Sequence, residues 1–206
     1  MRTILLACFT AAALTGCALL GKSDPVVPRY FAPEYASPPS TRPAAASQAA
    51  AGRPLLLGRV EGWSNLRERW VVRDPGGATS YAEDRRWTER PEVYLRRALS
   101  RALFEERGLV EALSGRATAL EVELIAFEEV ERPHQVRLQA LLVLRDDRLS
   151  LYQETVTVEQ PVAPSDESGR ERALLEAFSA ALRTGVARIA DQVVAQLVPR
   201  TAKASR

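Results

Sequence analysis

The sequence predicts an α+β fold, in which a mostly antiparallel sheet has two helices packed on one face and a flexible tether precedes the domain. Residues 117–160 hold three long segments with alternating apolar and polar residues, separated by short polar turns. Two other segments, 88–108 and 168–198, repeat apolar residues at helical spacing. Before Pro54 no apolar periodicity is sustained, which is typical of a tether.

Composition limits the number of domains and the kinds of partner. The chain has 206 residues, of which 46% are hydrophobic and 26% charged, and its formal net charge is +2. This is enough apolar sequence for one domain with a core. A nucleic-acid partner requires a strongly basic face, which this balance does not favour. We therefore expect one folded domain, over residues 54–198, and no nucleic-acid binding.

Residues 1–16 have the layout of a secretory signal peptide, with Arg2 followed by a short apolar stretch and small residues. The apolar stretch is shorter than the ~20 residues that a membrane-spanning helix needs. The letters LTGC then resemble the lipobox of bacterial lipoproteins, and they are Leu14, Thr15, Gly16 and Cys17. The alternative is an ordinary signal peptide with a chance cysteine.

The lipobox resemblance implies cleavage between Gly16 and Cys17 and acylation of Cys17, with palmitate as one such group. The only other cysteine, Cys8, lies inside the predicted signal peptide, so the mature chain would have no disulfide and no cysteine metal site. Ala18 stands where an aspartate tends to accompany retention in the inner membrane. We therefore expect a lipid anchor in the outer membrane, facing the periplasm.

Residues 17–53 read as the acylated cysteine and a tether rich in proline and alanine, with six prolines. Fully extended, this tether would reach over ~100 Å. One stretch stands out, RYFAPEY from Arg29 to Tyr35, with three aromatic residues. It is either an apolar patch of the linker or a short strand or clamp docked on the domain or on a partner.

The first half of the domain reads as strands followed by a helix. Residues 55–63 form a strand, and residues 68–73 and 78–83 form a hairpin around the turn DPGG, in which proline and glycine set the backbone angles. The helix over 88–108 has Thr88 as its expected N-cap, Pro91 in the first turn and Gly108 at its end. A short strand, LVEAL, follows.

The second half reads as an antiparallel meander followed by a long helix. The strands are predicted at 117–131, 134–146 and 148–160, joined by the short turns RPHQ and RDDR. The closing helix spans 168–198, in which Gly185 marks either a bend or a close contact. Residues 199–206 are expected to be a disordered tail.

No residue pattern predicts catalysis. The single histidine, His134, falls in a predicted turn and is interpreted as a surface residue. Glu128, Glu129 and Glu131 cluster beside the same turn, which is typical of a solvated edge, and no spaced ligand loop supports a calcium site. We expect no catalytic residue, no metal ligand and no cofactor, and we interpret the chain as a non-enzyme.

The most distinctive segment runs from Tyr81 to Val110, with Trp87 just before a helix that contains leucine pairs. Together with the lipobox, the strand LLLGRV, the run LEVELIAFEEV and the closing amphipathic helix, it resembles the ABC-type transport auxiliary lipoprotein family. Members of this family include the lipoprotein of the paraquat-inducible system. The resemblance covers residues 54–198.

This resemblance implies a non-catalytic, periplasm-facing subunit of a lipid transport system. In such systems an ABC permease and ATPase lie in the inner membrane, and an MCE-domain protein forms a conduit across the periplasm. The lipoprotein would dock the far end of the conduit at the outer membrane. The alternative is a stand-alone outer-membrane lipoprotein that binds an apolar ligand or assists the assembly of an outer-membrane protein.

Aromatic and arginine residues are enriched at protein contacts, so the expected docking surface is the outer face of the sheet with the first hairpin. The candidate contacts are Trp63, Trp70, Arg73, Tyr81 and Trp87. We expect the first three to be exposed. Trp87 is either a core residue between the sheet and the first helix or a partner contact. A head-to-tail contact could join copies of the chain into a ring around the conduit.

Overall fold

The computed structural model describes residues 25–35, 50–114, 117–147 and 149–198. The predicted signal peptide, the lipobox with Cys17, the remainder of the predicted tether and the tail at 199–206 lie outside the described residues.

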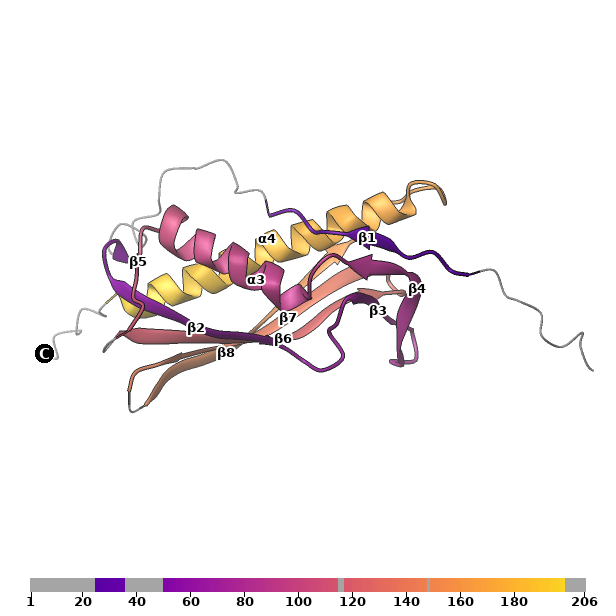
Figure 1. Cartoon of the computed structure of the whole chain (residues 1–206). Coiled ribbons are helices and arrows are strands. Elements are labelled where there is room, and N and C mark those ends of the chain that lie inside the picture. Colours follow the sequence, from indigo (N-terminus) through magenta and orange to yellow (C-terminus); the bar gives the residue numbers. More distant parts are fainter. Residues whose placement is uncertain (1–24, 36–49, 115–116, 148, 199–206) are drawn as a thin grey trace, which may run out of the picture.

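The described residues form one mixed sheet of eight strands, with the helices beside it (Figure 1). The strands are β1 Arg29–Phe31, β2 Pro54–Gly62, β3 Arg69–Arg73, β4 Thr79–Trp87, β5 Val110–Glu111, β6 Thr118–Val130, β7 Gln135–Arg145 and β8 Ser150–Pro161. The helical segments are α3 Pro91–Ser100, the π-helical η2 Arg101–Glu106 and α4 Arg170–Leu197.

Strand β6 organises the sheet because it is long enough to pair with three others. On one side it pairs antiparallel with β7, which in turn pairs antiparallel with β8. On its other side, the first half of β6 pairs parallel with β2 and its end pairs parallel with β3. Strands β4 and β1 continue the sheet beyond β3, and β5 continues it beyond β2.

The predicted α+β class is confirmed, as are the hairpin and the meander, which are the antiparallel part of the sheet. The parallel pairings join strands that are far apart in sequence. Strands β2 and β3 precede α3 and β6 follows it, and a connection through a helix brings strands together in parallel. Turn lengths between neighbouring strands carry no information about these pairings.

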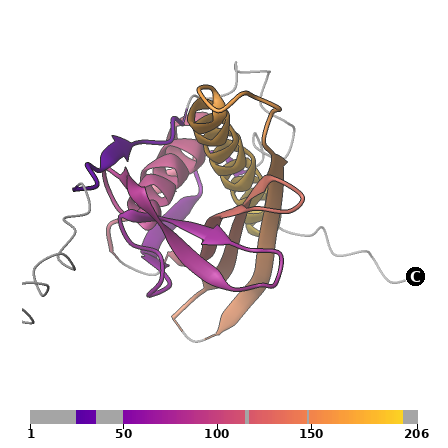
Figure 2. The same cartoon turned by 90° about the vertical axis from the view of Figure 1, so that its right-hand side faces the viewer.

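Both helices cover the same face of the sheet, as the end-on view shows (Figure 2). Helix α4 lies along β7 and β8, and α3 lies along β2. Gly185 of α4 marks a close contact, because a Cβ atom there would stand 2.9 Å from Leu138 Cδ2 of β7. The close-contact interpretation of Gly185 is therefore confirmed.

Helix α3 begins later than predicted. Arg90 occupies the N-cap position with an extended backbone and no side-chain cap, and Pro91 opens the helix. The predicted cap at Thr88 is wrong: its hydroxyl lies 2.7 Å from the Tyr94 hydroxyl, which also accepts a hydrogen bond from the Glu89 backbone N–H. Gly108 follows the helical segment with a positive φ of 68°, which suits glycine.

Residues 25–35, which we call the strap, are part of the folded domain. Strand β1 pairs in parallel with β4, with Arg29 opposite Arg85 and Phe31 opposite Trp87. The docked alternative for RYFAPEY is therefore confirmed, with the domain itself as the docking site. A flexible tether is the wrong description for the paired part of this segment, since the side chains of Phe31 and Tyr35 have partners inside the domain.

Candidate partner-binding surface

Two of the three tryptophan side chains lie at the centre of the core. Trp70 and Trp87 are 0% and 1% exposed, and their ring centroids lie 4.6 Å apart. Phe178 of α4 contacts both rings edge-on. The ring centroid of Phe31, in the strap, lies 5.0 Å from that of Trp70. The expectation that Trp70 is exposed is wrong, because β3 turns this side chain toward the helices. Trp87 is a core residue, and neither indole is available at the surface as a contact.

Glu128 and Glu129, at the end of β6, are buried, so the interpretation of these two residues as a solvated edge is wrong. Glu128 is 1% exposed. Arg73 donates to both of its carboxylate oxygens, at 2.9 and 3.1 Å, and Arg137 of β7 donates to the same group. The bond to Glu128 raises the pKa of Arg73 above its ordinary value. Arg73 is thus half-buried and paired rather than free for a partner.

Glu129, the next residue of β6, belongs to a separate series of ion pairs. It accepts from Arg85 of β4 at 3.3 Å and from Arg170 of α4 at 3.0 Å. Arg85 lies 3.7 Å from Asp84, and Asp84 pairs with Arg29 of the strap at 2.6 Å. Arg29 also donates to Glu171, the neighbour of Arg170, at 2.6 Å. This series ties the strap to β4, β6 and the first turn of α4.

An exposed patch of tyrosine and arginine lies on the outer surface of β1, β4 and β3. Tyr30 is opposite Arg86, and Arg86 is opposite Arg69, and such cross-strand partners share a face of the sheet. The Arg69 guanidinium lies over the Tyr81 ring, 5.4 Å from its centroid. We call these four residues the Tyr–Arg face.

The Tyr–Arg face has the composition of a protein contact. Tyr30 is 64% exposed and Tyr81 is 38% exposed. Within the described part of the chain, neither Arg69 nor Arg86 has an ion-pair partner, although Arg86 donates to the carbonyls of Ala82 and Arg85. Two unneutralised positive charges beside exposed aromatic rings favour a partner that carries carboxylates.

Of the five predicted contacts, Tyr81 and Trp63 are at the surface. Trp63, 48% exposed, follows β2, and its backbone N–H donates to the Leu124 carbonyl. Sequence reasoning missed Tyr30, Arg69 and Arg86 as a group. Tyr30 lies in the predicted tether, and only the pairing of β1 with β4 brings it beside Arg86. The aromatic cluster of RYFAPEY was the one feature of the sequence that could have indicated this pairing.

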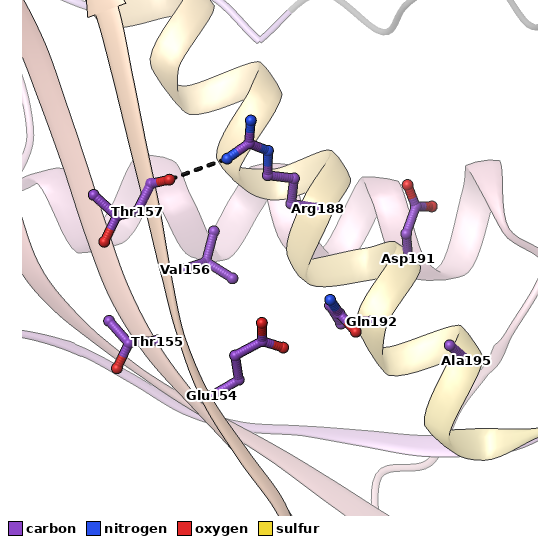
Figure 3. A pocket seen from close by; sticks show the side chains of 8 residues that line it. All are labelled: Glu154, Thr155, Val156, Thr157, Arg188, Asp191, Gln192 and Ala195. Atoms are coloured by element: carbon purple, nitrogen blue, oxygen red, sulfur yellow. Dashed lines mark hydrogen bonds between the residues drawn. The ribbon is translucent and has the colours of Figure 1, made fainter.

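The molecule also has open hollows, of which the one between β8 and α4 has a volume of about 730 Å³ (Figure 3). Glu154 and Gln192 point toward each other there, and Arg188 donates to the Thr157 carbonyl at 3.0 Å. The space between sheet and helices is instead filled by buried side chains. Charged and amide groups in this hollow do not suit an apolar ligand.

A metal site and a membrane-spanning helix each have requirements that the described ranges do not meet. These contain no group of histidine, cysteine, aspartate and glutamate side chains arranged to hold a metal ion. His134 is exposed in the turn between β6 and β7, as predicted. Over the same residues, no helix has the length and apolar character needed to cross a membrane.

The fold and the exposed patch define a domain that offers surfaces for binding. The chain matches the model of the ABC-type transport auxiliary lipoprotein component family over residues 36–194, which is well over half of its length. It therefore belongs to this family, and it is an auxiliary lipoprotein component that associates with an ABC-type transport system. The predicted family resemblance is confirmed. The strap ends at Tyr35, one residue before the matched range begins.

Solved structures share the fold at low sequence identity. Protein XCC0632 from Xanthomonas campestris, described under the family model DUF330, is 17% identical with a TM-score of 0.67, over 82% of this chain and 96% of that one. An uncharacterized protein is 14% identical with a TM-score of 0.62, over 81% and 99%. Protein CT253 from Chlamydia trachomatis is 9% identical with a TM-score of 0.50, over 70% and 98%. No curated protein matches the chain.

Proposed function

We propose that this lipoprotein is a non-catalytic docking subunit of an intermembrane lipid transport system. Its lipid anchor at Cys17 holds it in the outer membrane, facing the periplasm, and it seats the far end of a conduit formed by an MCE-domain protein. The conduit is served by an ABC permease and ATPase in the inner membrane. The Tyr–Arg face is the observation that carries this proposal, because it combines exposed aromatic rings with two arginines that lack ion-pair partners.

Docking of a conduit requires an anchor, a rigid domain and a contact surface, and it requires no catalytic group. The filled core supplies rigidity, and the Tyr–Arg face supplies the contact surface. Arginine and tyrosine are the residues that most often dominate binding energy at protein contacts. The partner surface is expected to carry carboxylates opposite Arg69 and Arg86.

The predicted ring of copies stays a prediction, which native mass spectrometry of the detergent-purified lipoprotein tests.

The test is affinity purification of the lipoprotein from membranes solubilised in mild detergent, with partners identified by mass spectrometry. We expect an MCE-domain protein to be recovered with the wild-type chain and lost with Tyr81→Ala. The matched control is Val93→Ala on α3, because both side chains are 38% exposed and only Tyr81 belongs to the Tyr–Arg face. Recovery of the lipoprotein alone at native expression would refute the docking function. If Tyr81→Ala leaves recovery of the MCE-domain protein unchanged, docking does not use the Tyr–Arg face.

A further inference from the structure

The strap is attached to the domain from Arg29 to Tyr35. At its start, Arg29 bridges Asp84 of β4 and Glu171 of α4, both at 2.6 Å. The β1 backbone pairs with β4, and the Thr88 N–H donates to the Phe31 carbonyl at 2.9 Å. The Phe31 ring then packs on Trp70 in the core.

The second half of the strap is fixed at two further points. The backbone N–H of Glu34 donates to the Ser179 hydroxyl of α4 at 3.0 Å, and Ser179 is buried. The Tyr35 hydroxyl donates to the Glu106 carboxylate of η2 at 3.3 Å. The strap thus crosses from β4 over α4 to η2, and it joins elements that lie far apart in sequence.

This attachment changes the length of chain between the anchor and the domain. If the domain began at Pro54, residues 17 to 54 would allow a reach of about 120 Å when extended. Since the first attached residue is Arg29, only residues 17 to 29 remain, and their reach is at most about 40 Å. The residues between Tyr35 and Ala50 connect two parts of one folded body and add nothing to this reach.

The attachment also selects one end of the domain. The chain enters the described fold at the end where the β3–β4 hairpin and the first turn of α4 lie (Figure 1). The C-terminal end of α4 lies at the opposite end. A short lead into Arg29 therefore keeps the first end, with the Tyr–Arg face, nearer to the anchor than the second.

We propose that the strap sets the height and the orientation of the domain above the bilayer, with the β3–β4 end toward the membrane. This inference rests on the proposed acylation of Cys17 and adds to it the segment that transmits the anchor's position to the domain. A conduit that delivers its cargo to the bilayer has to end beside this part of the domain.

Two insertions of the same flexible 15-residue Gly/Ser segment test the proposal. One is placed before the strap, between Lys22 and Ser23, and the other after it, between Arg42 and Pro43. The chain from Cys17 onward has a single cysteine, so its thiol can be coupled to a maleimide lipid in a supported bilayer. Neutron reflectometry then measures the distance between the protein layer and the headgroups.

The insertion before the strap lengthens the lead from about 12 to about 27 residues. The span of a flexible chain grows with the square root of its length, so the protein layer should rise by about 10 Å. The insertion after the strap should leave the layer where the unmodified chain has it. Equal rises for both insertions would overturn the proposal, because they would show a continuous tether up to Pro54. No rise for either would also overturn it, because other contacts would then set the height.

A third chain separates attachment from folding. In Arg29→Glu/Phe31→Ala the strap loses its ion pairs and its core contact, so the insertion after the strap should now raise the layer as well. If the melting curve shows a folded domain and the layer still does not move, the strap does not act through these contacts. Because the lipid is coupled chemically and no partner is present, the outcome is independent of acylation in the cell and of docking.

Discussion

The ring of Trp70 stacks on the ring of Trp87 at the centre of the domain, with the ring planes inclined by 24°. The two side chains come from adjacent strands, β3 and β4, and Phe178 of α4 closes the cluster from above. The hairpin predicted to contact a partner thus directs its two tryptophans toward the helices. Its outward side chains Arg69 and Tyr81 belong to the Tyr–Arg face.

Trp87→Ala should lower the free energy of unfolding by about 3–5 kcal/mol, because it leaves a cavity among Trp70, Phe127 and Phe178. Urea denaturation of the purified protein measures this change. Trp63→Ala is the matched control, since Trp63 is 48% exposed and its replacement should change stability by less than about 0.5 kcal/mol. Equal losses for the two variants would contradict the buried position of Trp87.

Glu128→Ala should also destabilise the domain, because it leaves Arg73 and Arg137 without their shared carboxylate. Breaking a fully buried pair costs about 3–5 kcal/mol, and we expect about 2–3 kcal/mol here since both arginines reach solvent. Glu121→Ala on the same strand is the control: its single pair with Arg145 is exposed and should contribute at most about 1 kcal/mol. A loss for Glu128→Ala no larger than the control's would show that the pair contributes little.

Burial, together with the Glu106 carboxylate, raises the pKa of Tyr35 to about 12. The contribution of this docked tyrosine to stability is therefore present below the ordinary tyrosine value of about 10 and is lost as the pH rises through 12. Absorbance of tyrosinate against pH should show a late component that Tyr35→Phe removes. The pKa of Tyr152 is raised as well, by its bond to Glu154, so one late tyrosine should remain in the variant. If the titration curves of the wild type and of Tyr35→Phe coincide above pH 11, about one unit past the ordinary tyrosine value, the docked position of Tyr35 is contradicted.

Cys17→Ser should abolish lipidation and remove the protein from the outer-membrane fraction, because no other residue of the LTGC sequence can form the thioether. Membrane fractionation, with labelling by a palmitate analogue, measures both effects. Thr15→Ser keeps a small hydroxyl residue before the cleavage point and should be processed normally. Unchanged outer-membrane recovery of Cys17→Ser would exclude the anchor.

Sequence reasoning succeeded where the pattern is local. The alternation along residues 117–160, the turn DPGG and the helical repeat of the closing helix each depend on neighbours a few residues apart, and all three appear in the structure. The signal at Gly185 was also local, although only the packing against Leu138 decided between a bend and a contact.

It failed where the partner of a residue lies far along the chain. Glu128 and Glu129 look solvated beside a turn, but the arginines that bury them come from β3, β4, β7 and α4. Arg29 looks like part of a tether, and its partners are Asp84 and Glu171. Tyr30 was missed for the same reason, since only the pairing of β1 with β4 places it beside Arg86.

The central claim is that the Tyr–Arg face seats an MCE-domain partner, and photo-crosslinking in the cell tests it most directly. A photoreactive phenylalanine analogue is placed at position 81 or, as the control, at position 93, which has the same exposure of 38%. After irradiation, the adduct at position 81 should contain a peptide of the MCE-domain protein, and position 93 should give none. Adducts at neither position, or the same adducts at both, would contradict docking through this face.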